Sequence, residues 1–172
     1  TLLNSVEAII WEADFKTSKI HFVSQHAVSL LGYPVEKWMG DPTLFASICH
    51  PEDLPKVQRA KDSVTRENNH YEVIYRMKCA DGKYIWLSDR VNVDFDGVEP
   101  KTMRGISYDV SERRRIEEAL ALVVEVIAEA SELERTDDIS LHCISRICQL
   151  TNWQIGQAWY PSADGDALQC SD

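Results

Sequence analysis

Hydrophobic and polar residues alternate along three segments in the middle of the chain, which predicts three consecutive β-strands. An Asp-Gly pair begins each of the two connections between them, at positions 81 and 96, and such pairs favour turns between antiparallel strands. The segments are Tyr71–Cys79, Tyr84–Phe95 and Lys101–Val110. We expect them to form an antiparallel meander.

Shorter elements precede the meander. Glu7–Phe15 and Ile20–Ser24 alternate in the manner of a strand hairpin, and segments with helical spacing follow. Pro51 and the acids beside it favour the start of the longest of these helices. The predicted helical segments are His26–Gly32, Val35–Trp38, Thr43–Cys49 and Glu52–Glu67. This order predicts an α+β fold in which inserted helices cover one face of a sheet.

A polar junction follows the last strand and leads into a long helix. Asp109 and Ser111 offer capping oxygens and Glu112 follows Asp109 by three residues, so we expect the helix to begin where the strand ends. Apolar residues then recur at alternating spacings of four and three, the pattern of a coiled-coil seam. The seam residues are Ile116, Leu120, Val123, Ile127 and Ala130. We expect a homodimer through the 111–134 helix.

Residues 137–172 predict one further helix and a pair of strands. The helix is Asp137–Asn152, and the strands are Trp153–Tyr160 and Ala167–Cys170. A segment of this length is too short for a core of its own. Because the chain also begins without Met, we expect it to be a fragment of a longer protein.

Three stretches together resemble the PAS family over about residues 1–115. They are the helix start at His50–Asp53, the Asp81–Leu87 hairpin with its Gly-Lys-x-x-Trp pattern, and Gly105–Arg114 with its Asp-Val-Ser-Glu-Arg ending. The resemblance implies a five-stranded antiparallel sheet, with a cleft for a ligand or protein contact under the helices. It also implies that the ending couples the last strand to a signalling helix. The junction residues are Asp109, Val110, Ser111, Glu112 and Arg113.

The family resemblance divides the chain into three parts. Residues 1–110 form the expected PAS sensor domain, and 111–136 form a signalling helix or coiled-coil linker. Residues 137–172, through Thr151–Tyr160, are similar to the opening of a GAF domain that is incomplete here. This order resembles the sensory part of bacterial sensor histidine kinases and diguanylate cyclases.

Charge, hydropathy and cysteine content bear on the partners and the location that we expect for this chain. The formal net charge of −10 disfavours binding to nucleic acid, which requires clustered Lys and Arg. We find neither an apolar run of about 18 residues nor a signal peptide, so we expect no membrane contact within this fragment. The five Cys residues are odd in number and lack the spacing of a secreted disulfide framework. These features favour a cytoplasmic location.

Familiar cofactors and catalytic groups are not indicated. Light-sensing PAS proteins that bind flavin carry a Cys within Asn-Cys-Arg-Phe-Leu, and the sequence around Cys49 lacks this pattern. Haem sensors of the family use a His inside the helix that corresponds to Glu52–Glu67, and this segment contains no His. Cys143 and Cys148 do not share a helix face well, so core packing is favoured over a metal site. We expect no haem, flavin or metal, and no enzymatic activity in this fragment.

One carboxylate lies in an apolar stripe. On Tyr84–Phe95, Asp89 has the same register as Leu87 and Val91, so it should face the helices. Two explanations remain open: Asp89 and Ser107 contact a polar ligand, or Asp89 lies in a salt bridge or a partly open cleft. By the resemblance, the lining of the cleft would also include Tyr75, Met77, Leu87, Val91, Met103 and Gly105. An unidentified small organic ligand is the candidate occupant.

These expectations define a sensory and relay module of a bacterial signal-transduction protein. A change in the cleft would pass along the last strand and through a dimeric coiled coil to a downstream effector of the same chain. The architecture favours a sensor histidine kinase as the parent, with a diguanylate cyclase as an alternative. A ligand-free dimerisation or spacer module is the competing class.

Overall fold

The structure is a computed structural model that describes residues 7–130, 142–148, 154–157, 159–162, 166 and 168–170. The chain divides into two compact units, Thr1–Arg113 and Arg114–Asp172. No helix in the described part of the chain has the length and hydropathy needed to cross a membrane.

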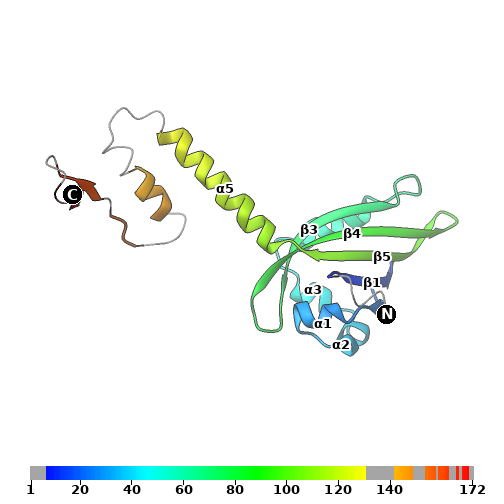
Figure 1. The fold of residues 1–172 in the computed structure, drawn as a ribbon. Helices are drawn as coiled ribbons and strands as arrows, with labels where there is room; N and C mark the ends of the chain where they lie inside the picture. Colours follow the sequence, from blue (N-terminus) through cyan, green and yellow to red (C-terminus); the bar gives the residue numbers. More distant parts are fainter. Residues whose placement is uncertain are drawn as a thin grey trace. The chain divides into compact units, whose positions relative to one another are not determined.

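The first unit is built on a five-stranded antiparallel sheet (Figure 1). Its strands are β1 (Ile9–Asp14), β2 (Ile20–Val23), β3 (His70–Lys78), β4 (Tyr84–Asp96) and β5 (Glu99–Asp109). Their order across the sheet is β2-β1-β5-β4-β3, so the N-terminal hairpin joins the meander through pairing of β1 with β5. The predicted α+β fold with this sheet is therefore confirmed, and β5 is its central strand.

Four helices connect β2 to β3. They are α1 (His26–Leu31), α2 (Val35–Gly40), α3 (Leu44–Ile48) and α4 (Leu54–Asp62). Figure 1 shows α1, α2 and α3 gathered on one side of the sheet. Gly32 ends α1 with a positive φ of 81°, and its N–H donates to the Val28 carbonyl, as a glycine C-cap does.

The predicted helix Glu52–Glu67 is wrong at both ends, because the observed helix is Leu54–Asp62. Beyond it the chain turns: the Thr65 N–H donates to the Asn68 carbonyl, and the Asn68 N–H donates to Thr65 Oγ1. A hydroxyl that bonds nearby backbone in this way competes with helical hydrogen bonding. The acidic and basic residues that follow Asp62 suit a helix surface by composition, but this local competition ends the helix earlier.

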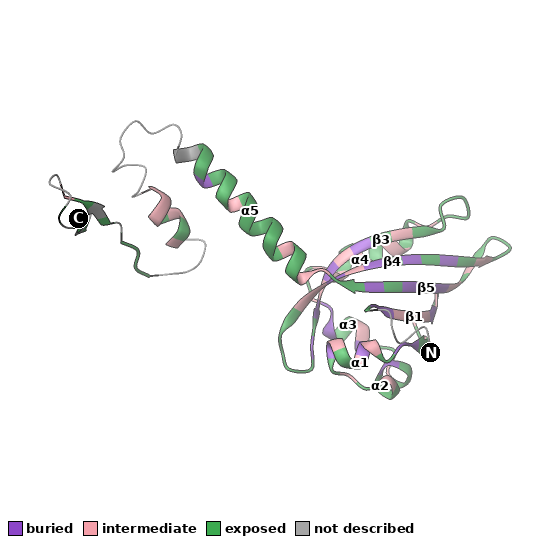
Figure 2. Ribbon diagram, viewed as in Figure 1, coloured by how far each residue is buried: buried purple, intermediate pink, exposed green. Residues whose placement is uncertain are grey.

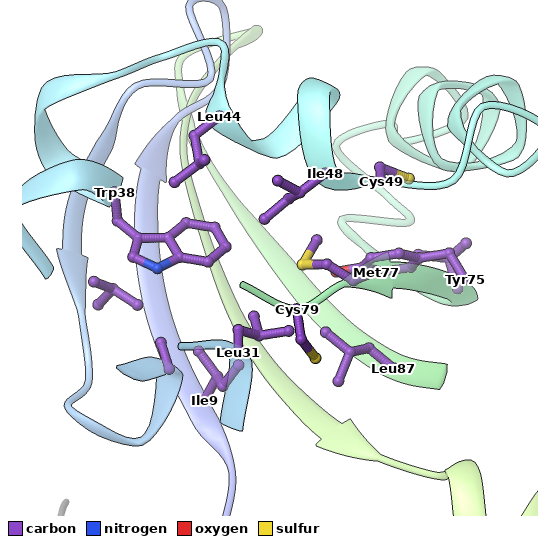
Figure 3. Close-up of a cluster of buried hydrophobic side chains, with 13 residues drawn as sticks. Ile9, Leu31, Trp38, Leu44, Ile48, Cys49, Tyr75, Met77, Cys79 and Leu87 are labelled. Atoms are coloured by element: carbon purple, nitrogen blue, oxygen red, sulfur yellow. The ribbon is translucent and has the colours of Figure 1, made fainter. Parts of the chain in front are cut away.

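Burial alternates along β4 as the sequence predicts. Leu87, Asp89, Val91 and Val93 are each at most 3% exposed, whereas residues between them such as Arg90 are exposed. Figure 2 shows this alternation as purple and green bands along the strand. The inward-facing residues of the sheet and the helices form the core, part of which is drawn in Figure 3. Because one face is buried, the register of β4 is strongly specified.

An ion pair fastens the start of α4 to β3. Arg76 Nε donates to Asp53 Oδ2 at 2.8 Å and its Nη2 donates to Oδ1 at 3.0 Å, while Nη2 also reaches Glu52 Oε2 at 2.8 Å. Hydrogen bonds from Arg76 lower the pKa of Asp53 to about 2. His50 Nδ1 accepts the Glu52 N–H at 3.3 Å, so His50 helps to shape this turn. These contacts fix α4 over the sheet.

The helix α5 (Ser111–Ala130) begins two residues after β5 ends. In the second unit, residues 142–148 are helical, and β6 (Trp159–Pro161) pairs antiparallel with β7 (Leu168–Cys170). The predicted strand Trp153–Tyr160 is too long, since residues 154–157 have no regular structure. The rest of the predicted helix Asp137–Asn152 lies outside the described residues, as does the side chain of Ala130.

Candidate functional site

A cavity of about 590 Å³ lies between the helices and the sheet of the first unit. Every strand of the sheet and all four helices α1 to α4 contribute to its wall. This volume is within the usual range for small-molecule sites. Figure 3 shows the side chains of Trp38, Tyr75, Met77 and Leu87, which belong to this wall.

Six of the eight residues predicted to line the cleft do line this cavity. They are Tyr75, Met77, Leu87, Asp89, Met103 and Ser107. The other two, Val91 and Gly105, are not part of its wall. Val91 instead packs in a second buried cluster with Ala13, Val93 and Met103, because the strand carries it past the end of the cavity.

Gly105 affects the cavity indirectly, because the ring of Trp11 packs against it. A Cβ at this position would come within 2.3 Å of the Trp11 ring carbons Cε2 and Cζ2, so only glycine permits this close approach. The Trp11 ring nitrogen Nε1 then donates to Ser107 Oγ at 3.1 Å. Gly105 and Ser107 therefore hold the indole of Trp11, which forms part of the cavity wall.

Asp89 is the buried carboxylate of the site. The Tyr75 hydroxyl donates to Asp89 Oδ2 at 2.9 Å, whereas Asp89 Oδ1 is buried and has no hydrogen-bond partner among the described residues. Burial raises the pKa of Asp89 to about 6; the neighbouring hydroxyls of Ser107 and Tyr75 oppose this rise only in part. Ser107 lies opposite Asp89 in the sheet, and its hydroxyl favours the charged form of Asp89 as a donor, although the pair lacks the geometry of a full hydrogen bond.

The structure decides part of the question that the sequence leaves open about Asp89. Among the described residues, no Lys, Arg or His forms an ion pair with it, so the salt-bridge explanation is wrong. Burial and the charge of Asp89 instead raise the pKa values of Tyr71 and Tyr75. Both phenols are neutral at pH 7. Asp89 is thus enclosed by uncharged groups at one wall of the cavity.

Another residue of the cavity wall, Trp38, also has a buried polar atom without a hydrogen-bond partner among the described residues. Trp38 on α2 is 7% exposed, and its ring N–H makes no hydrogen bond with the described residues. The ring packs edge-on against Tyr33, with centroids 6.4 Å apart. Trp38 was not predicted as a site residue, because the surrounding helix is short and its apolar spacing predicts only core packing.

Among the residues that the structure describes, Lys61 is the one basic residue in the cavity wall. Its ammonium group donates to Ser18 Oγ at 2.9 Å and lies 4.9 Å from the centre of the Phe15 ring. Burial lowers the pKa of Lys61. The sequence did not single out this residue, since a Lys near the end of a helix is ordinarily a surface residue.

Cys49 has the environment of a packing residue. It is 3% exposed, and burial raises the pKa of its thiol to about 11, so the thiol is neutral at pH 7 and a weak nucleophile. It does not form part of the cavity wall.

Two hydrogen bonds tie the junction between β5 and α5 to β4, and a third lies within the junction itself. The Ser111 N–H donates to Asp109 Oδ1 at 2.8 Å, and the Trp86 N–H donates to Ser111 Oγ at 2.9 Å. The Val110 N–H donates to the Trp86 carbonyl at 2.9 Å. The prediction that the helix begins where the strand ends is confirmed. Asp109 accepts the N–H of the first helical residue, whereas Ser111, predicted as a second capping residue, accepts a hydrogen bond from β4 and not from the helix. Glu112 and Arg113 follow in the first turn.

Known proteins share this architecture. The chain is 27% identical to the crystal structure of a sensory box histidine kinase/response regulator from Burkholderia thailandensis, covering 72% of this chain and 92% of that one with a TM-score of 0.60. It is 28% identical to the N-terminal domain of a diguanylate cyclase with a PAS/PAC sensor from Marinobacter aquaeolei, covering 62% and 98% with a TM-score of 0.50.

A curated relative is the methyl sulfide methyltransferase-associated sensor of Methanosarcina acetivorans. It is 27% identical over 140 residues, which are 77% of this chain but only 14% of that protein. The family model described as the PAS fold matches residues 20–106, just over half of the 172 residues. The match contains the four helices and most of the sheet that enclose the cavity. The chain belongs to the PAS family.

Proposed function

We propose that the chain is a sensory and relay module that passes the state of its cavity to a downstream effector. The observation that carries this proposal is the course of β5. Met103 and Ser107 on this strand form part of the cavity wall, and the strand ends at Asp109, whose carboxylate accepts the first N–H of α5. One strand therefore joins the cavity wall to the start of the helix.

The proposed mechanism is a shift between two arrangements of the junction. A molecule in the cavity contacts Met103 and Ser107, and displacement of β5 changes how Asp109 and Ser111 hold the helix start. Tightly packed elements pass between discrete arrangements more readily than they deform continuously. A ligand shifts this equilibrium only by its difference in affinity for the two arrangements.

The parent protein is proposed from the relatives. Two similar structures come from a histidine kinase/response regulator and a diguanylate cyclase, and the curated relative is named a sensor. We place a sensor histidine kinase first and a diguanylate cyclase second. The GAF-like nature of residues 137–172 and a cytoplasmic location remain part of this proposal.

Native mass spectrometry tests whether the purified protein carries a small molecule in its cavity. Native mass spectrometry of the purified protein, read beside its absorption above about 350 nm, should show a small co-purified mass and no visible band. Met77→Trp, which places a larger side chain at a wall residue that is only 1% exposed, should lose that mass. A protein without any added mass would favour the spacer module, and a flavin or haem band would overturn the expectation of no such cofactor.

We predict that replacing the junction residues uncouples input from output. Ser111→Ala removes the acceptor of the Trp86 N–H and Asp109→Ala removes the acceptor of the Ser111 N–H, each at a cost of about 1 kcal/mol in folding stability. In the full-length parent, effector activity should no longer respond to the signal, while the double variant still unfolds in one cooperative transition, at a melting temperature lowered by roughly 4–8 °C. Normal regulation in the double variant would remove this junction from the mechanism.

We predict that α5 pairs with a second copy of itself. The seam residues Ile116, Leu120, Val123 and Ile127 are 54%, 59%, 52% and 62% exposed in the single chain, which leaves an apolar stripe open to a partner. Leu120→Glu should raise the dimer dissociation constant at least about a hundredfold, because a pair of buried Leu side chains is lost. Light scattering after gel filtration measures this, with Ala121→Glu as the off-seam control. Equal dimerisation of the two variants would contradict the coiled coil.

A further inference from the structure

Lys61 is a cation on the face of α4 that is turned to the cavity. Leu54, Val57 and Lys61 follow one another at spacings of three and four, which places them on one face of the helix, and each is partly buried. All three belong to the cavity wall. A helix that packs on a sheet ordinarily carries apolar residues at such positions, so the charge at position 61 requires an explanation.

The contacts that Lys61 makes within the protein do not neutralise its charge. Among the described residues, its ammonium group forms one hydrogen bond, to Ser18 Oγ at 2.9 Å, and it lies 4.9 Å from the centre of the Phe15 ring. The carboxylates of Asp14 and Asp62 attract it, but each accepts a hydrogen bond from another neighbour instead. An ammonium group has three donors, so Lys61 keeps donors for a further partner.

Burial makes a further partner favourable. It lowers the pKa of Lys61, because the charged form loses part of its solvation. An anion beside the ammonium group would compensate for this loss. In partly apolar surroundings such a pair is also stronger than it is in water.

The cavity reaches solvent along α4. Pro55 and Gln58 on this helix belong to the cavity wall and are exposed, and Lys61 is only partly buried. A charged head group placed beside Lys61 can therefore stay partly hydrated, while the apolar body of the same molecule enters the cavity.

The only other charged residue in the described cavity wall is enclosed and lies toward the other end of the sheet. Asp89 is 3% exposed and its Oδ1 is buried. It shares a row of the sheet with Ser107 and Ile9, whereas Phe15, which Lys61 contacts, comes six positions after Ile9. Since a strand rises about 3.3 Å per residue, the two rows are about 20 Å apart. An anion beside Lys61 is therefore well separated from the Asp89 carboxylate.

We propose that the cavity binds a molecule with one carboxylate and an apolar body, and that the carboxylate pairs with the Lys61 ammonium group at the edge of the cavity. The proposal rests on the sensory function above, since it names the class of molecule that the same cavity takes. A single ammonium group matches a single negative charge, whereas a phosphate carries more charge and is usually bound by several donors. The other wall residues are mostly apolar and suit the body.

Octanoate, 1-octanol and octylammonium test this chemistry, because they share one chain and differ in the head group. Isothermal titration of the whole chain at neutral pH and low salt should show that octanoate binds at least about tenfold more tightly than 1-octanol, since a hydrogen bond between charged groups is stronger than a neutral one. Octylammonium should bind most weakly. 1-Octanol should compete with octanoate, because both chains occupy the same cavity.

A matched pair of variants tests the role of Lys61. Lys61→Met keeps most of the length of the side chain but removes its charge, so octanoate should lose its advantage while 1-octanol still binds. Lys19→Met is the control, because Lys19 follows Ser18, is exposed and is not part of the cavity wall. This control should keep the wild-type preference. An unchanged preference in Lys61→Met, or its loss in both variants, would overturn the assignment.

The outcomes distinguish this inference from the proposed function. If octanoate and 1-octanol bind alike to the wild type, or if octylammonium binds most tightly, the inference fails although the cavity remains a ligand site; this comparison needs no variant. If no probe binds while a co-purified mass is present, the apolar acid is the wrong class and sensing stands. If no probe binds and no mass is present, both proposals fail.

Discussion

Asp89→Asn is expected to make the protein more stable than the wild type at neutral pH. Burial raises the pKa of Asp89 from its ordinary value of 3.8 to about 6. Between these two values the folded protein keeps a proton that the unfolded chain has released, so the stability of the wild type falls as the pH rises through this window. Above it, the cost of burying the charge is fully present.

The raised pKa of Asp89 sets the expected size of this difference in stability. One pKa unit corresponds to about 1.4 kcal/mol, so the stability difference between Asp89→Asn and the wild type should grow by up to about 3 kcal/mol from pH 4 to pH 7. Urea unfolding at several pH values measures this difference. Asp53 titrates outside the window, because Arg76 lowers its pKa to about 2.

Asp96→Asn is the matched control for this experiment. Asp96 lies at the end of the same strand, but its side chain is 74% exposed. Because water solvates this exposed charge, its replacement should not give the large gain in stability at neutral pH that is expected of Asp89→Asn. If the Asp89→Asn difference stayed constant from pH 4 to pH 7, Asp89 would titrate normally in the folded protein, and its enclosure by uncharged groups would be incorrect.

A large loss of folding stability is expected when Gly105 is replaced by Ala. In Gly105→Ala the new methyl group would meet the Trp11 ring at 2.3 Å, so the ring must move and the hydrogen bond from Trp11 to Ser107 is lost. Such overpacking, together with a lost buried hydrogen bond, costs about 2–3 kcal/mol. The melting temperature should fall by roughly 10 °C, which calorimetry can follow.

Gly40→Ala provides a matched control. Nothing lies within 4 Å of a Cβ built at Gly40, which is the last residue of α2, so this variant should melt at nearly the wild-type temperature. The double variant Gly105→Ala with Trp11→Phe should recover part of the loss, since the smaller ring leaves room. A Gly105→Ala protein as stable as Gly40→Ala would show that Trp11 does not need this close approach.

Local patterns were sufficient to predict the strands and their antiparallel meander, whereas the five-stranded sheet was implied by the family resemblance. Alternation placed Leu87, Asp89 and Val91 on one face, and the Asp-Gly pair at 81 identified the turn before β4. Both features depend on residues close together in the sequence. The end of α4 was missed because Thr65 and Asn68 form a turn whose hydrogen bonds outweigh a composition suited to a helix.

The cavity could be predicted only on its sheet side. Asp89 lies opposite Ser107 across β4 and β5, and Tyr75 on β3 lies opposite Leu87, the neighbour of Asp89 on the same face, so strand alternation and the family resemblance were sufficient to name them. Trp38 and Lys61 enter the wall from helices, and no local pattern says how those helices pack over the sheet. Gly105 was assigned to the cleft on resemblance, but the structure shows that it supports Trp11 from outside the wall.

The hydrogen bond from Trp86 to Ser111 has a practical consequence. The Trp86 amide belongs to the backbone of β4, yet its acceptor is the side chain that starts α5. Its exchange with heavy water therefore depends on whether the junction is closed. A single amide signal in a nuclear magnetic resonance spectrum then reports the junction directly, in a chain that need not carry an effector or a known stimulus.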